Sequence, residues 1–265
     1  MTLTVGTGPF GHRPAGRFNF DLPPERVEYL EAFPRRIRAL AGGEIVADSI
    51  DVRMLYEQHR LPAWCFPSED VRRDLLGDGA WLYEEGLAKG LVGIRWDAVD
   101  QWLEEEEEVI AHPRDPYHRL ELRDTSRRVQ VTLDGEQLAV SSRALALFET
   151  SLPPRWYFDP AEVRVELGPN PVRTACAYKG WASYFDACLV GRVEPALAWR
   201  YDEPLEGMGR IRGRICFFNE RVELTVDGVR QEQPRNRWST TDWMNDTSAD
   251  DRGRKRLGLE PPADS

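Results

Sequence analysis

The stretch GEQLAVSSRALALFETSLPPRWYFDPAEVRVEL (135–167) repeats an earlier one, GEIVADSIDVRMLYEQHRLPAWCFPSEDVRRDL (43–75). The two align 92 positions apart without a gap, and 12 of the 33 aligned residues are identical. These identities mix turn, core and polar types, as in the pairs Gly43/Gly135, Glu57/Glu149 and Trp64/Trp156. Shared composition does not place such a mixture in register, so the chain contains two copies of one structural unit.

Short runs that alternate between apolar and polar residues fill both copies. The runs include 36–40, 45–48, 127–133, 137–140, 210–218 and 222–226. Alternation of this kind, with many β-branched and aromatic residues, predicts strands. Ser68 is the expected N-cap of one short helical turn. We therefore expect a mainly β protein of two tandem small β domains with short helices.

The repeat also sets the expected domain boundaries. The two ends of the chain are rich in Pro, Gly, Arg and Asp, which is typical of arms and tails rather than of a core. The expected parts are an N-terminal arm (1–30), a shortened first repeat (31–111), a linker (112–119), a complete second repeat (120–230) and a flexible C-terminal tail (231–265).

The two copies differ in length at one place. Between the end of the matched stretch and the next matched Trp lie 5 residues in the first copy and 31 in the second. The excess includes RTACAYKGWASYFDA (173–187), whose residue types predict an extra hairpin, with a turn at GPNP (168–171). Gly180 inside this pattern predicts a bulge or a close approach of another backbone segment.

Composition excludes several protein classes. A hydrophobic content of 41% excludes global disorder, and a net charge of −10 disfavours a nucleic-acid partner. No apolar run approaches the roughly 20 residues of a membrane span, and the first residues lack the apolar core of a signal peptide. We expect a cytoplasmic protein without a membrane partner. The four cysteines have neither paired nor zinc-finger spacing, so no structural zinc and no disulfide is expected.

Several motifs together resemble one protein family. They are the repeated G-x-x-x-A-x-S and P-x-W-x-F, followed by Cys176-Ala177-Tyr178-Lys179-Gly180, A-W-x-Y and F-F-N. The chain resembles the family known as domain of unknown function 427, also labelled nucleotidyltransferase-like. Its linker is similar to the one that joins tandem copies in actinobacterial members. The resemblance covers about residues 30–230. It implies a compact β fold similar to the β-tent group and no established reaction.

The sequence departs from the family pattern in two ways. The usual Cys-Pro-Tyr-Lys-Gly has Ala177 in place of the proline, and the first copy lacks the motif altogether. If the motif carries function, only the second copy is active, and the first is a support or a partial lid.

Lys179, beside Tyr178, is the leading candidate for chemistry. It would serve as an acid, a base or an amine nucleophile if partial burial lowers its pKa. Glu149 is a candidate charge partner. The alternative is that Lys179 and Glu149 form a buried ion pair that only holds the extra hairpin in place.

A second group of candidates is aromatic. These side chains, with Cys176 nearby, either line an apolar ligand pocket or simply fill the core. Trp181 and Tyr184 are unique to the insertion and favour the pocket, whereas Trp156 and Trp199 have first-copy equivalents and favour the framework. The full aromatic set is Trp156, Trp181, Tyr184, Trp199 and Tyr201.

His112 and His118 in the linker form a further pair. They are either a proton-transfer pair, or half of a metal site, or parts of a connector locked by hydrogen bonds, which is the commoner arrangement.

The residues together favour a metal-independent small-molecule-binding protein without a cofactor. We expect an enzyme that uses acid/base or amine chemistry in a pocket of the second repeat. A non-catalytic scaffold or oligomerisation module is the first alternative, and a nucleotidyltransferase, as the family label suggests, is the second. A homodimer is left open, and the sequence does not specify the substrate.

Overall fold

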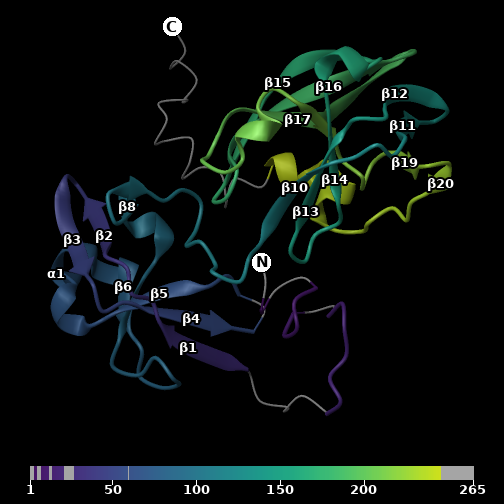
Figure 1. Cartoon of the computed structure of the whole chain (residues 1–265). Helices are drawn as coiled ribbons and strands as arrows, with labels where there is room; N and C mark the ends of the chain where they lie inside the picture. The colour runs from purple at the N-terminus through teal and green to yellow at the C-terminus, as the bar shows by residue number, and fades with distance from the viewer. Residues whose placement is uncertain (1–2, 5–6, 12–13, 21–26, 59, 246–265) are drawn as a thin grey trace, which may run out of the picture. The chain divides into compact units, whose positions relative to one another are not determined.

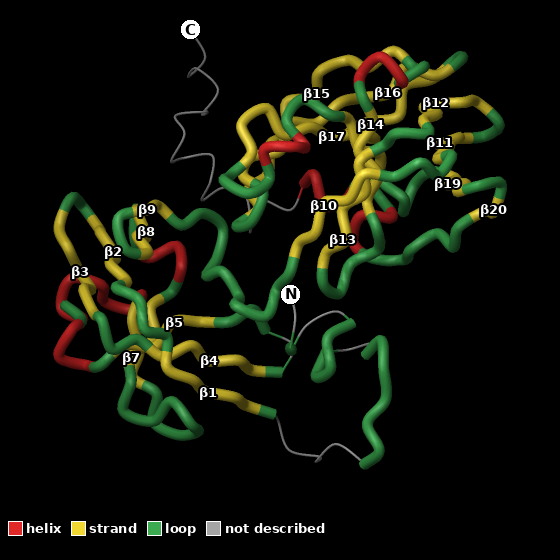
Figure 2. Tube along the Cα trace, viewed as in Figure 1, coloured by secondary structure: helices red, strands yellow, loops and turns green. Residues whose placement is uncertain are grey.

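The computed structural model describes residues 3–4, 7–11, 14–20, 27–58 and 60–245. Strands dominate it, and the helical segments are short (Figure 2). Contacts divide the chain into two compact units, 1–118 and 119–265. The protein is therefore mainly β and has two parts. No helix among the described residues is long and apolar enough to cross a membrane.

The first unit has two antiparallel sheets (Figure 1). Its only α-helix among the described residues is α1 (Arg73–Leu76). The five-stranded sheet has the order β1 (Glu28–Ala32), β4 (Arg53–Glu57), β5 (Ala63–Phe66), β7 (Val92–Ile94) and β6 (Ala80–Leu82). The four-stranded sheet has the order β3 (Glu44–Ser49), β2 (Ile37–Ala41), β8 (Gln101–Glu104) and β9 (Glu107–Glu108). Three 3₁₀ turns cover Ser68–Asp70, Gly77–Gly79 and Trp96–Ala98.

The second unit repeats this plan with a larger sheet. The seven-stranded sheet has the order β10 (Leu120–Asp124), β13 (Leu145–Glu149), β14 (Arg155–Phe158), β18 (Ile215–Phe217), β17 (Arg192–Pro204), β16 (Gly180–Leu189) and β15 (Glu166–Cys176). The four-stranded sheet has the order β12 (Glu136–Ser141), β11 (Val129–Leu133), β19 (Glu223–Val226) and β20 (Val229–Arg230). The 3₁₀ turns are Pro160–Glu162, Gly209–Ile211, Arg237–Ser239 and Asp242–Asn245.

The duplication extends to individual strands. Each of β1 to β5 recurs 92 positions later with the same bounds, as β10 to β14. The larger sheets also share an order, since β10-β13-β14-β18-β17 matches β1-β4-β5-β7-β6. The 26-residue excess appears as two strands added at one end of the sheet, β16 and then the edge strand β15, beside a longer β17 (Figure 1). The predicted extra hairpin is therefore present.

Two local predictions within this frame are wrong. GPNP does not form a turn but lies inside β15, where the pairing with β16 shifts between Asn170 and Arg173. Prolines are tolerated there because β15 is an edge strand, and an edge strand has backbone groups with no ladder partner. Ser68 is not an N-cap either, because it is the first residue of its 3₁₀ turn and Pro67 precedes it without a side-chain cap.

Apolar side chains fill the space between the two sheets of each unit. In the second unit, Trp156 and Phe158 of β14 and Leu224 of β19 belong to this core. A second apolar cluster, the aromatic cluster, covers the other face of the seven-stranded sheet. It contains Leu122, Leu145, Leu147, Tyr157, Ala182, Tyr184, Ala196, Trp199, Tyr201, Ile211, Cys216, Phe218 and Trp243. Both faces of the large sheet thus carry buried apolar side chains.

The chain ends differ in part from the expected arm and tail. β1 begins at Glu28, inside the range assigned to the arm. Trp243, in the range assigned to the tail, is 5% exposed and packs in the aromatic cluster. The segment 231–245 therefore contributes to the core of the second unit, because its tryptophan has a large apolar surface to bury. Residues 246–265 of the predicted tail and 21–26 of the predicted arm lie outside the described residues.

Candidate functional site

Lys179 is placed by the tight turn that joins β15 to β16. Its backbone N–H donates to the carbonyl of Cys176 at 3.3 Å, which closes the turn over Ala177 and Tyr178. Gly180 follows with φ of +100°, and a Cβ atom there would lie 3.1 Å from the backbone oxygen of Glu203. The register with β17 shifts directly after Gly180. The predicted bulge and the predicted close backbone approach are both confirmed.

The Lys179 side chain forms a buried ion pair with Glu149. The Nζ atom lies 2.5 Å from Oε2 of Glu149, the last residue of β13. The two side chains are 10% and 5% exposed. The candidate partner named from the sequence is therefore the partner in the structure. The ion pair does not test whether Lys179 and Glu149 take part in chemistry, so their chemical roles stay predictions. The same holds for Tyr178 and Cys176, which are half-buried.

The electrostatic environment keeps Lys179 charged. Burial by itself lowers the pKa of Lys179, but the influence of Cys176 and of Glu149, with the hydrogen bond to Glu149, more than offsets it. The pKa therefore lies above its usual value. An amine nucleophile needs the neutral form, so the condition set for amine chemistry, a lowered pKa, is not met.

The aromatic candidates do not surround one cavity. Tyr184, Trp199 and Tyr201 belong to the aromatic cluster, whereas Trp156 belongs to the core between the sheets, on the other face of the large sheet. Trp181 is half-buried and lies an odd number of residues from Tyr184 in β16, so it points to the face opposite Tyr184. Alternation along the strands separates residues that the sequence analysis grouped.

A second buried ion pair was not anticipated from the sequence. The guanidinium of Arg155 donates two hydrogen bonds of 2.7 Å to the carboxylate of Glu220, and Asn236 donates a third at 2.8 Å. Burial raises the pKa of Glu220, but the bonds from Arg155 outweigh it and leave the pKa below its usual value. Arg155 also lies over the ring of Trp199 at 5.4 Å. The available signal was a charged residue directly before the apolar residues of β14.

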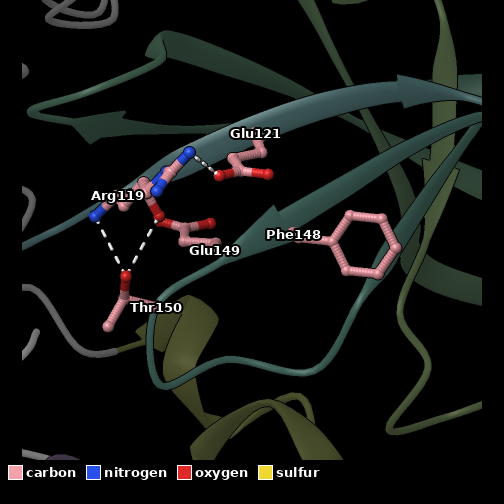
Figure 3. Close-up of a pocket in the computed structure, with 5 residues that line it drawn as sticks. All are labelled: Arg119, Glu121, Phe148, Glu149 and Thr150. Atoms are coloured by element: carbon pink, nitrogen blue, oxygen red, sulfur yellow. Dashed lines mark hydrogen bonds and ion pairs between the residues drawn. The ribbon is translucent and has the colours of Figure 1, made fainter.

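An open hollow of about 250 Å³ lies where β10 begins and β13 ends. Its lining residues are Arg119, Glu121, Phe148, Glu149 and Thr150 (Figure 3). Thr150 ties the two strands together, since its hydroxyl accepts from the Arg119 N–H at 3.0 Å and donates to the Arg119 carbonyl at 3.2 Å. Glu149 thus belongs to both the hollow and the buried ion pair.

The first unit keeps one half of this arrangement. Glu57, the equivalent of Glu149, ends β4 and pairs with Arg60 at 3.1 Å. The Arg60 side chain is 63% exposed and the Glu57 side chain 12%, so here the carboxylate pairs with an exposed cation. The first unit has no strands equivalent to β15 and β16 and hence no residue equivalent to Lys179. Only the second unit combines the carboxylate with a buried ammonium.

The linker histidines both belong to the first unit. His112 is half-buried, and burial lowers its pKa to about 4. Its Nδ1 lies 2.8 Å from the carbonyl oxygen of Pro113. Within the part of the chain that the structure describes, no three His, Cys, Asp or Glu side chains are placed to hold a metal ion. Metal independence stays a prediction.

Comparison with known proteins adds a family but no activity. No curated protein matches the chain. The family described as domain of unknown function (DUF427) matches residues 29–81 and 121–228, which is more than half of the chain. The two segments fall in the two units, one segment in each. The chain therefore belongs to the DUF427 family, as a tandem member whose first copy is the shorter one.

Proposed function

We propose that the second unit is a metal-independent small-molecule enzyme that carries out acid/base chemistry through the Lys179–Glu149 pair. The observation that carries this proposal is the double position of Glu149, which pairs with a buried lysine and also lines the hollow. A ligand in the hollow would transfer a proton to the Glu149 carboxylate and later recover it. Carboxylates are common proton-transfer groups in enzymes.

Lys179 would serve this chemistry as a fixed positive charge. Its raised pKa keeps the ammonium protonated at neutral pH, so it would hold Glu149 in one position and orient its second oxygen. A buried carboxylate without such a partner is costly. We do not assign a nucleophilic amine to Lys179, because its pKa direction disfavours the neutral form.

A non-catalytic scaffold is the second candidate, and burial of the pair favours it. The ion pair connects the β15–β16 turn to the end of β13 and would anchor the hairpin without any chemistry. In either case, removal of one partner leaves a buried charge unpaired. Stability of a single variant therefore does not separate the two candidates.

The double variant Lys179→Met with Glu149→Gln separates them. We expect Lys179→Met alone to lose about 3 to 5 kcal/mol of unfolding free energy, and the double variant to recover most of that loss because neither charge of this pair remains. Wild type and double variant are then incubated with the same metabolite mixture, and mass spectrometry measures which compounds are converted. We expect at least one conversion that the double variant slows by about 10² or more.

The first unit offers a matched control. Glu57→Gln with Arg60→Met alters the equivalent carboxylate and its surface partner, and we expect it to leave the conversion unchanged. A folded double variant at Lys179 and Glu149 with a wild-type conversion profile would contradict the enzyme and leave the scaffold.

A further inference from the structure

Phe148 presents an exposed aromatic ring at the hollow of the second unit. It is 45% exposed, although it lies in β13 between buried neighbours. Figure 3 shows it on one side of the hollow, with Arg119 and Thr150 on the other. A single exposed aromatic residue is ordinary on a protein surface. The first unit supplies the observation that makes this one informative.

In the first unit, the equivalent surface is covered by the chain itself. Tyr56, the equivalent of Phe148, is 0% exposed. The ring of Tyr117 lies edge-on to it at a centroid distance of 5.8 Å. The hydroxyl of Tyr117 donates to Glu31 at 2.8 Å, and the hydroxyl of Tyr29 donates to the same oxygen at 2.9 Å. The repeated fold can therefore hold a planar ring against the residue at the position of Tyr56. The polar end of that ring contacts the residue at the position of Glu31.

The second unit replaces that acceptor with a cation. Arg123 occupies the position of Glu31, and Glu121 the position of Tyr29. Glu121 forms ion pairs with Arg123, at 2.7 Å, and with Arg119. Two guanidinium groups thus share one carboxylate. The net charge of these three residues is +1. The polar end of a ring packed on Phe148 would therefore face guanidinium donors, whereas the hydroxyl of Tyr117 in the first unit faces a carboxylate acceptor.

We infer that the hollow binds a small free aromatic carboxylate. Its ring packs on Phe148, as Tyr117 packs on Tyr56. Its carboxylate accepts hydrogen bonds from Arg119, which lines the hollow, or from Arg123, which pairs with the lining residue Glu121. A guanidinium fork matches a carboxylate in charge and in geometry. This inference rests on the proposed function only in placing the ligand at the hollow, and it holds whether or not Glu149 transfers a proton.

Benzoate is the probe that tests this inference. The full chain is titrated by NMR, with the amide signals of Phe148 and Thr150 as reporters of the site. For a ligand of this size we expect a dissociation constant of about 1 mM. Benzyl alcohol, which lacks the charge, and cyclohexanecarboxylate, which lacks the aromatic ring, should each bind about tenfold more weakly or worse.

Two substitutions at exposed positions identify the site. Phe148→Thr removes the ring, and Arg123→Glu restores the first unit's residue, and each should weaken benzoate binding by about tenfold or more. The control is Trp81→Thr in the first unit, where the side chain is 41% exposed, and it should leave the affinity unchanged. Unchanged benzoate affinity in Phe148→Thr, or no saturable binding to the wild type, would overturn the inference.

The double variant Lys179→Met with Glu149→Gln separates this inference from the proposed function. Retained benzoate binding in that variant, together with an unchanged conversion profile, would support the ligand class and refute the acid/base role. If the wild type does not bind benzoate but the double variant loses the conversion, the acid/base role is supported and the ligand class is refuted.

Discussion

Two ion pairs among the described residues of the second unit join buried charged residues. Arg155 faces Glu220 through two hydrogen bonds, and Lys179 faces Glu149 through one. A buried pair contributes little net stability compared with apolar residues of similar size, but the loss of either partner is costly. The main effect of the pairs is therefore to specify which parts of the chain must come together, and their net contribution to stability is small. The first unit, which lacks β15 and β16, has no equivalent of the Lys179 pair.

His112 gives a pH-dependent prediction at the scale of one residue. Its pKa is lowered to about 4 in the folded protein, against about 6.5 in the unfolded chain. The unfolded chain therefore binds the proton first as the pH falls. The stability associated with neutral His112 is complete above pH 6.5 or so, and it is lost as the pH falls toward about 4.

Urea unfolding of the wild type and of His112→Gln at several pH values checks this expectation. The stability advantage of the wild type should shrink between pH 7 and pH 4.5 or so. Asp115 and His118 are present in both proteins, so the two proteins differ only at residue 112. A difference that does not change with pH would contradict burial as the cause of the lowered pKa.

At the scale of elements, the β15–β16 hairpin depends on Gly180. Its φ of +100° is unfavourable for other residues, and an added Cβ would also press on the backbone oxygen of Glu203 at 3.1 Å. We expect Gly180→Ala to lose about 2 to 3 kcal/mol, measured by thermal melts, because backbone strain and a close contact add together. The turn that presents Lys179 should loosen with it.

Gly191 in the neighbouring β16–β17 turn is the matched control. It also has a positive φ, +78°, but nothing lies within 4 Å of its added Cβ. Gly191→Ala should therefore lose only about 1 kcal/mol, from strain alone. Equal losses in the two variants would show that the approach of Glu203 does not constrain the hairpin.

At the scale of the whole molecule, the second unit should fold alone if its C-terminal segment is included. Trp243 packs on Tyr184 and Phe218, with ring centroids 5.0 Å and 5.6 Å away. A fragment of residues 119–245 should keep its strand content by circular dichroism. A fragment of 119–235 should lose about 3 kcal/mol or more in urea unfolding, since it lacks this buried tryptophan.

A full chain with Trp243→Ala provides the comparison for the truncated fragment. It should lose less free energy of unfolding than the fragment 119–235 does, because it keeps the rest of the segment, including Asn236, which donates to Glu220. Equal stability of the two fragments would contradict the placement of Trp243 in the aromatic cluster.

The sequence by itself determined the duplication, the mainly β class, the family and the extra hairpin. These features are local or periodic: alternation predicts strands, and a repeat at constant spacing aligns residues without any knowledge of contacts. Glu149 was also named from the sequence as a candidate partner of Lys179, because it lies in the segment that the two copies share.

Only the tertiary structure decided which side chains lie on the same face of a sheet and which charged side chains form pairs. Trp156 and Trp199 are alike in sequence, since each has a tryptophan equivalent in the first copy. They lie on opposite faces of the large sheet, because β14, β18 and β17 pair across long sequence separations. The pair of Arg155 and Glu220 and the charge state of Lys179 depend on burial and on distances between residues far apart in the chain. Such quantities follow from packing in three dimensions, and neither periodicity nor spacing encodes them.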